Sequence, residues 1–197
     1  MIFREDTYRV LLVSASDKFN TVTASLLPSS EFWPVTVAKS AGEAQRRLLD
    51  ARYDIVLVNT PLPDEFGTAL AEDACEKTQA SVLLLVKREL HDEIYCKVME
   101  AGVITLPKPT NEAAMSQMLR TLCSVRERLR RLEERQVTVE KKIEELRLVN
   151  RAKWILIERA HMTEGEAHRH ITQQAMKQRT SKKEIAARIL FREGNNG

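Results

Sequence analysis

The positions of proline and glycine constrain this chain of 197 residues more than any other feature of its sequence. All six prolines lie at or before Pro109, and Gly165 is the only glycine between Gly102 and Gly194. Because proline breaks helices and glycine weakens them, the chain beyond Pro109 is expected to be almost entirely helical. The chain is long enough for one domain with an appendage or for two small domains.

Charge follows the same division. Residues 1–112 hold 12 Lys/Arg and 17 Asp/Glu, whereas residues 113–197 hold 19 Lys/Arg and 11 Glu. No apolar run approaches the ~20 residues that span a bilayer, and residues 1–6 lack the pattern of a signal peptide, so a cytoplasmic protein without membrane contact is expected. No zinc site or disulfide framework is expected either, because the three cysteines are far apart and form no CxxC pair: Cys75, Cys96 and Cys123.

Short apolar runs alternate with amphipathic segments in the first part, which predicts an α/β domain with a five-stranded parallel sheet. Ligands of such sheets bind beyond the carboxyl ends of the strands, so the residues at those ends are the candidates for a site. The apolar runs cover residues 9–13, 34–38, 54–58, 81–86 and 103–106, and the helical patterns lie near 17–27, 42–52, 67–79 and 90–101.

Residues 8–112 resemble a response-regulator receiver domain, which has a flavodoxin-like fold. The resemblance rests on the segments 54–67 and 101–109, around the third and fifth apolar runs. It implies a phosphorylated Asp after the third strand and an acidic Mg²⁺-binding pair after the first. It also implies that a Thr or Ser after the fourth strand and a Lys after the fifth contact the phosphoryl group.

This chain departs from the family at almost all of those positions, which predicts a pseudo-receiver over residues 1–112. An amide is not the nucleophile that an aspartyl phosphate needs, and Mg²⁺ has lost its carboxylate ligands. The remaining lysine either keeps a role in the site or orients the loop around Pro107 and Pro109, and the second interpretation is favoured. The equivalent residues are Asn59 for the phosphoacceptor, Ser14 and Ala15 for the acidic pair, Val86 for the Thr/Ser, and Lys108.

An apolar 3–4 spacing runs through residues 113–150 and predicts a dimerising coiled-coil helix. Two of the three g–e pairings between parallel chains join opposite charges, and the two polar a residues would fix register. The alternative is an amphipathic helix that packs on its own sheet, which a receiver accommodates only through about Val125. The predicted interface comprises Leu122, Val125, Leu129, Leu132, Gln136, Val139, Ile143, Leu146 and Asn150.

Residues 147–192 divide into three helical stretches and predict a small all-α domain. Capping-box patterns at Thr163–Glu166 and Ser181–Glu184 begin the second and third helices. Trp154 is expected in the core or the dimer interface rather than as a platform for base stacking. The predicted core residues are Ile155, Leu156, Met162, Ala167, Ile171, Ala175, Met176, Ile185, Ala186 and Ile189.

Many basic side chains lie on this segment, which is typical of a nucleic-acid-binding surface but also of a solvated helical surface. The segment resembles an ANTAR domain, the RNA-binding module of transcription antiterminators, through Arg151–Lys153, Met162–Ala167 and Ala175–Arg179. Trp154 departs from the family, which usually has a small residue there. The whole architecture is similar to the antiterminators of the amidase and ethanolamine operons.

The resemblance implies a homodimer that binds tandem hairpins in a nascent leader RNA and so prevents terminator formation. Since phosphorylation is not expected, a small ligand, a regulatory sensor protein or the expression level would control the regulator. The residues expected to contact RNA are Arg151, Lys153, Lys177, Arg179, Lys182 and Lys183.

Two other functions remain open. One is a protein-binding adaptor that uses the coiled coil and the basic domain, and the weaker one is DNA binding by the last two helices. No nucleophile–base pair, phosphate loop or metal cluster is recognisable, so neither an enzyme nor a cofactor is expected.

Overall fold

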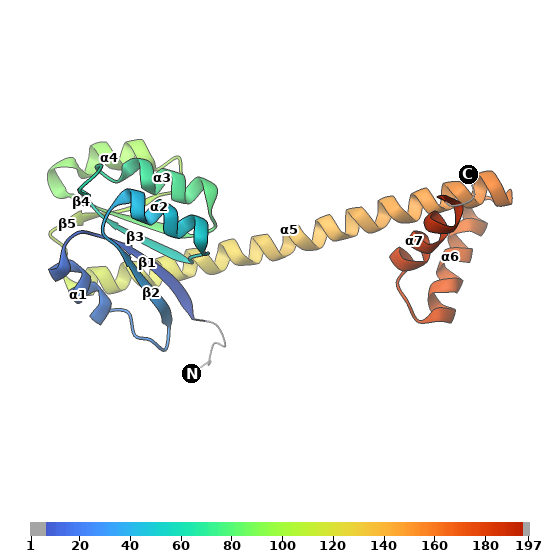
Figure 1. Ribbon diagram of the computed structural model, residues 1–197, viewed down its shortest axis with the longest axis horizontal. Coiled ribbons are helices and arrows are strands. Elements are labelled where there is room, and N and C mark those ends of the chain that lie inside the picture. Colours follow the sequence, from blue (N-terminus) through green and yellow to red (C-terminus); the bar gives the residue numbers. More distant parts are fainter. Residues whose placement is uncertain (1–6, 195–197) are drawn as a thin grey trace. The chain divides into compact units, whose positions relative to one another are not determined.

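The computed structural model describes residues 7–194, and the chain forms two compact units, residues 1–131 and 132–197 (Figure 1). The residues on which the expectation of no signal peptide rests, 1–6, lie outside the described residues. Among the residues that the structure does describe, no helix has the length and apolar character needed to cross a membrane.

The first unit is a five-stranded sheet in the order β2-β1-β3-β4-β5, with every neighbouring pair parallel. This arrangement confirms the predicted receiver-like α/β fold. Its elements are β1 (Tyr8–Val13), α1 (Asp17–Ser25), β2 (Phe32–Ala38), α2 (Ala41–Asp50), β3 (Ile55–Asn59), α3 (Thr68–Lys77), β4 (Ser81–Lys87), the 3₁₀ turn η1 (Arg88–Leu90), α4 (His91–Val98), β5 (Ile104–Lys108) and the start of α5 (Glu112–Ala160).

Alternate residues of the central strands point to opposite faces of the sheet, so each strand contributes to two cores. Leu11, Val56 and Leu84 belong to the core shared with α2, α3 and α4. On the other face, Leu12, Leu57 and further residues pack with side chains of α1 and α5. The central strands read as continuous apolar runs because both of their faces are covered, as Figure 1 shows.

Serine caps begin two of the helices. Ser16 Oγ accepts from the backbone N–H of Phe19, and Ser40 Oγ accepts from that of Glu43. The carboxylate of Glu43 in turn accepts from the backbone N–H of Lys39 at 3.0 Å, which lowers the pKa of Glu43. The capping-box spacing in the sequence thus marks the true start of α2, although its carboxylate reaches Lys39 in place of Ser40.

The second unit consists of the end of α5, α6 (Glu164–Gln178) and α7 (Lys182–Gly194). Thr163 and Glu166 form the predicted capping box, with Glu166 Oε2 accepting from the backbone N–H of Thr163 at 2.8 Å. Ser181 Oγ accepts from the backbone N–H of Glu184 at 3.1 Å at the start of α7. The fully buried core residues of this unit are aliphatic: Val149, Ala152, Ile171, Ala175, Ile185 and Ala186.

One core expectation for this unit is wrong, because Met176 is 75% exposed. Trp154 is 63% exposed and lies outside the core, while its place in a dimer interface stays a prediction. Alanine and β-branched side chains fill the space between the three short helical faces, so no room is left inside for these larger groups.

Gly67 precedes α3 with φ +108°, a region that side-chain-bearing residues rarely adopt. A Cβ there would lie 3.1 Å from Val58 Cγ1 and 3.3 Å from Thr60 Cγ2. We therefore expect Gly67→Ala to lower the free energy of unfolding by about 1–3 kcal/mol in urea denaturation followed by circular dichroism. Gly42→Ala is the matched control and should change it by less than about 1 kcal/mol, since a Cβ at Gly42 meets only an ordinary contact at 3.6 Å. Equal losses in the two variants would contradict this account of the β3–α3 loop.

Candidate functional site

Polar side chains that follow β1, β3 and β5 meet at the carboxyl edge of the sheet, where the degenerate phosphorylation site is expected. Lys108 Nζ donates to Asn59 Oδ1 at 2.7 Å and also to the backbone carbonyl of Thr60. Asn59 Nδ2 donates to Ser14 Oγ at 3.0 Å. Since an ammonium group can only donate, it fixes the orientation of the Asn59 amide and leaves the amide nitrogen for Ser14. The three residues form one hydrogen-bonded chain across the edge.

The other two residues of the predicted set do not join this chain. Val86 is fully buried in the core beneath the edge, and Ala15 is exposed. Asp17 does not replace the missing acidic pair, because it lies on α1 and its carboxylate pairs with Lys39 Nζ at 3.3 Å. The site therefore holds no carboxylate at the positions that would bind Mg²⁺.

The Lys108 side chain contacts residues at the end of β3 and not the loop around Pro107 and Pro109. Its contact with the Thr60 carbonyl holds the first residue of the β3–α3 loop. Thr60 is itself buried, and its Oγ1 donates to the carbonyl of Leu85 at 2.8 Å. Thr60 is thus a part of the site that the sequence analysis missed, although it directly follows the recognisable Asn59.

Lys87 is a second missed residue, and it is the strand partner of Lys108 in the β4–β5 pairing. Burial lowers the pKa of Lys108, and the positive charge of Lys87 lowers it further. The edge therefore presents two neighbouring cations and a neutral amide where an active receiver has a cluster of acids. Within residues 7–194, no three His, Cys, Asp or Glu side chains gather in a way that could hold a metal ion.

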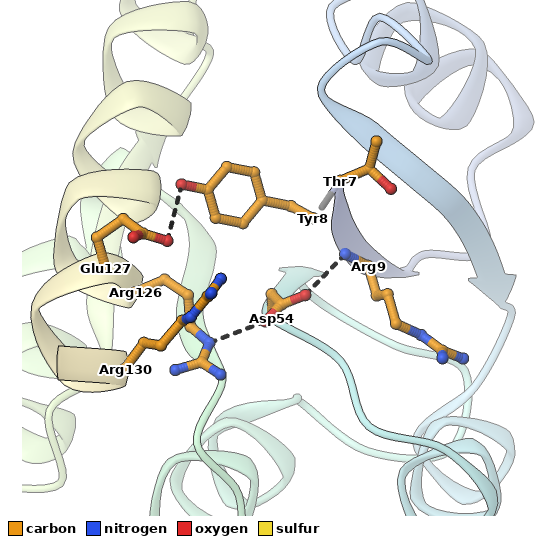
Figure 2. Close-up of a pocket in the computed structure, with 7 residues that line it drawn as sticks. All are labelled: Thr7, Tyr8, Arg9, Asp54, Arg126, Glu127 and Arg130. Atoms are coloured by element: carbon orange, nitrogen blue, oxygen red, sulfur yellow. Dashed lines mark hydrogen bonds and ion pairs between the residues drawn. The ribbon is translucent and has the colours of Figure 1, made fainter. Parts of the chain in front are cut away.

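At the opposite edge of the sheet, α5 is tied to the amino ends of β1 and β3 (Figure 2). Asp54 accepts from Arg126 Nε at 2.9 Å and from the backbone N–H of Arg9 at 2.9 Å, and Tyr8 Oη donates to Glu127 at 3.4 Å. These contacts border a cavity of about 300 Å³. Sequence reasoning missed this cluster, because its members are separated by up to 119 residues.

The predicted coiled-coil residues divide into two groups along α5. Leu122 is fully buried in the receiver core, so its assignment to a dimer interface is wrong, and Val125 and Leu129 are half-buried. A heptad pattern does not distinguish packing on the chain's own sheet from packing on a second helix. The remaining apolar members are exposed: Leu132 by 50%, Val139 by 54%, Ile143 by 43% and Leu146 by 61%.

The two polar a residues, Gln136 and Asn150, are exposed as well. Gln136 Nε2 donates to Glu140 Oε1 at 3.1 Å within the same helix. Both side chains therefore remain accessible on the same stretch of α5 as the apolar side chains.

The six residues expected to contact RNA differ in their surroundings. Arg151, Lys177 and Arg179 are exposed and carry no ion pair within the described part of the chain. Lys153 Nζ is held by Glu164 Oε1 at 3.0 Å, and only 15% of its side chain is exposed. Arg179 ends α6 with φ +51°, which turns the chain towards α7.

The last two of the six residues expected to contact RNA, Lys182 and Lys183, lie on the first turn of α7. Lys183 Nζ pairs with Glu144 Oε2 at 2.7 Å, which lowers the pKa of Glu144, and Lys182 is half-buried. Lys153 and Lys183 therefore fasten α6 and α7 to α5. The sequence pattern reveals neither ion pair, since the partners lie 11 and 39 residues apart.

Comparison with known proteins gives matches to both parts of the chain. Residues 130–190 match the ANTAR domain family. Over 183 residues, the chain is 25% identical to the transcriptional regulatory protein PdtaR of Mycobacterium tuberculosis, covering 92% of this chain and 89% of that protein.

Solved structures resemble the first unit. A receiver domain protein from Methanospirillum hungatei superimposes with a TM-score of 0.55 at 20% identity, over 62% of this chain and 98% of that one. The signal receiver domain of an HD domain-containing protein from Pseudomonas fluorescens gives 0.57 at 20% identity, over 68% and 98%. The chain therefore joins a domain of the response-regulator receiver fold to a segment that matches the ANTAR domain family.

Proposed function

We propose that this protein is a dimeric RNA-binding regulator of transcription antitermination that acts without aspartyl phosphorylation. It would bind tandem hairpins in a nascent leader RNA and prevent a terminator hairpin from forming. The observation that carries the proposal is the ANTAR match over residues 130–190, and the similarity to a transcriptional regulatory protein over most of the chain supports it.

The charge of the second unit favours RNA as the partner. Arg151, Lys177 and Arg179 are exposed and are not neutralised by carboxylates of the described residues, so phosphates can approach them. Lys153 and Lys183 are already paired and contribute mainly to holding the three helices together. Contacts between exposed basic side chains and the RNA phosphates give affinity, whereas contacts with unpaired loop bases give sequence specificity.

The exposed side chains of α5 favour a dimer. Leu132, Val139, Ile143 and Leu146 repeat with a 3–4 spacing and would be covered by the same residues of a second, parallel chain. Two ANTAR domains in one particle match the requirement for two hairpins.

The carboxyl edge of the sheet supports regulation by other means than phosphorylation. The Asn59 amide is not a nucleophile, and Lys108 and Ser14 already occupy its two polar atoms. The hydrogen bonds among Asn59, Ser14 and Lys108 would then hold the ends of three strands together.

Removal of an exposed arginine should weaken RNA binding without affecting the dimer. The probe is a two-hairpin RNA obtained by crosslinking the protein to RNA in its host and sequencing the fragments. We expect Arg179→Ala and Arg151→Ala each to raise the Kd several-fold in filter binding, and to reduce the salt slope by about 1. Arg88→Ala, an exposed arginine of the first unit, is the charge-matched control and should leave the Kd unchanged. Equal Kd values for all three variants would contradict the proposed interface, and binding of duplex DNA in preference to RNA would favour the DNA-binding alternative.

A charged residue on the exposed apolar positions of α5 should separate the chains. We expect Val139→Glu combined with Leu146→Glu to give a monomer in sedimentation equilibrium at micromolar concentration, because two pairs of like charges would be buried against each other. Val137 is also 48% exposed but lies outside the a and d positions, so Val137→Glu should remain dimeric. A wild-type monomer at this concentration would contradict the proposed coil.

The receiver should not respond to phosphoryl donors. We expect incubation with acetyl phosphate or beryllofluoride and Mg²⁺ to leave the intact mass and the hydrogen-exchange pattern of the first unit unchanged. Asn59→Asp should not restore a stoichiometric adduct, because Ser14 and Ala15 supply no carboxylate for Mg²⁺. An aspartyl adduct on the wild-type chain would disprove the proposed pseudo-receiver.

A further inference from the structure

The second unit has two aromatic residues, and both lie on its surface. Trp154 is 63% exposed and Phe191 is 72% exposed, while the buried core is made of valine, isoleucine and alanine. A tryptophan on the surface offers a large flat apolar ring with a polar N–H, and such side chains are enriched at interfaces.

Trp154 points away from the core of its own unit. Val149, Ala152 and Leu156 are the α5 residues that pack against α6 and α7. At about 100° per residue, Trp154 lies roughly on the opposite side of the helix from those three. No rearrangement of α6 or α7 is therefore needed to keep its ring accessible.

The face around Trp154 is basic. Arg147 and Arg151 are exposed two turns and one turn before it, and Arg151 is a direct neighbour on the helix surface because it lies three residues away. Glu158 is the only acidic residue of this face, and His161 directly follows the end of α5. A flat aromatic ring beside exposed arginines is the combination that binds unpaired nucleotides, with the base on the ring and the phosphates on the cations.

A second copy of the chain fits this surface less well. Trp154 occupies an e position, which in a parallel coil would face the g position of the other chain, Val149. The side chain of Val149 is only 8% exposed, because the core of its own unit covers it. Trp154 therefore cannot make the usual e–g contact. The exposed apolar a and d residues of α5 end at Leu146, before Trp154.

We propose that Trp154 is a stacking platform for an unpaired base in the loop of an RNA hairpin, with Arg147 and Arg151 contacting the flanking phosphates. This inference rests on the proposed RNA binding and adds a residue that reads the loop.

The full chain with Trp33→Phe leaves Trp154 as the only tryptophan and makes it a reporter. We expect its fluorescence to be quenched on titration with the crosslinked two-hairpin RNA, with a midpoint equal to the Kd from filter binding. Trp154→Leu should raise the Kd about tenfold or more, and Trp154→Phe should stay within about threefold of wild type. Phe191→Leu is the matched control for an exposed aromatic and should not change the Kd. The salt slope of Trp154→Leu should equal that of wild type, because no phosphate contact is removed.

The RNA is varied in parallel by replacing single loop bases with abasic nucleotides. At the stacked position, the losses from the abasic RNA and from Trp154→Leu should not add, because both remove the same contact. Unchanged affinity of Trp154→Leu, or dissociation of its dimer in sedimentation, would overturn the inference while RNA binding stands. Failure of the wild-type chain to bind RNA at all would overturn the proposed function and the inference with it.

Discussion

The structure depends on a single helix, α5, that runs for 49 residues without proline or glycine. Its first turns supply Met115, Leu119 and Leu122 to one face of the receiver sheet, and its last turns supply Val149 and Ala152 to the core of the ANTAR domain. Neither unit can complete its core without its own part of α5. The stretch between them has its apolar residues exposed, and these are the residues that the proposed dimer would bury.

The carboxyl edge of the receiver sheet is held by hydrogen bonds. In an active receiver phosphorylation changes the charge of this edge, whereas here Lys108 donates to the Asn59 amide and the Thr60 carbonyl. The pKa of Lys108 is lowered by burial and by Lys87, but the lysine keeps two acceptors, which offset part of the cost of its charge. At the other edge, Arg126 and Asp54 fasten α5 to the sheet. If the chain is not phosphorylated, as proposed, an input signal would have to act through a different surface than this site.

The sequence predicted those parts of the molecule that depend on local pattern. The five strands follow from apolar runs buried on both faces, and the start of α6 after Thr163 follows from its capping box. It did not predict features that arise when distant segments meet. The heptad register placed Leu122 in a dimer interface, because periodicity does not reveal which surface covers a residue.

Likewise, the sequence does not reveal that Lys153 forms an ion pair with Glu164. Trp154 was expected in the core or the dimer interface, but the small core of valine, isoleucine and alanine leaves no space for its ring inside the unit. Charge and exposure together, and neither alone, therefore identify the residues available to RNA.

The central claim is that two copies of this chain, joined through α5, present two ANTAR domains to two hairpins. Native mass spectrometry of the full chain with a two-hairpin RNA tests it most directly. The account predicts one complex with two chains and one RNA, and a large loss of affinity when either hairpin is deleted. A complex with one chain per RNA, bound as tightly to a single hairpin, would contradict it.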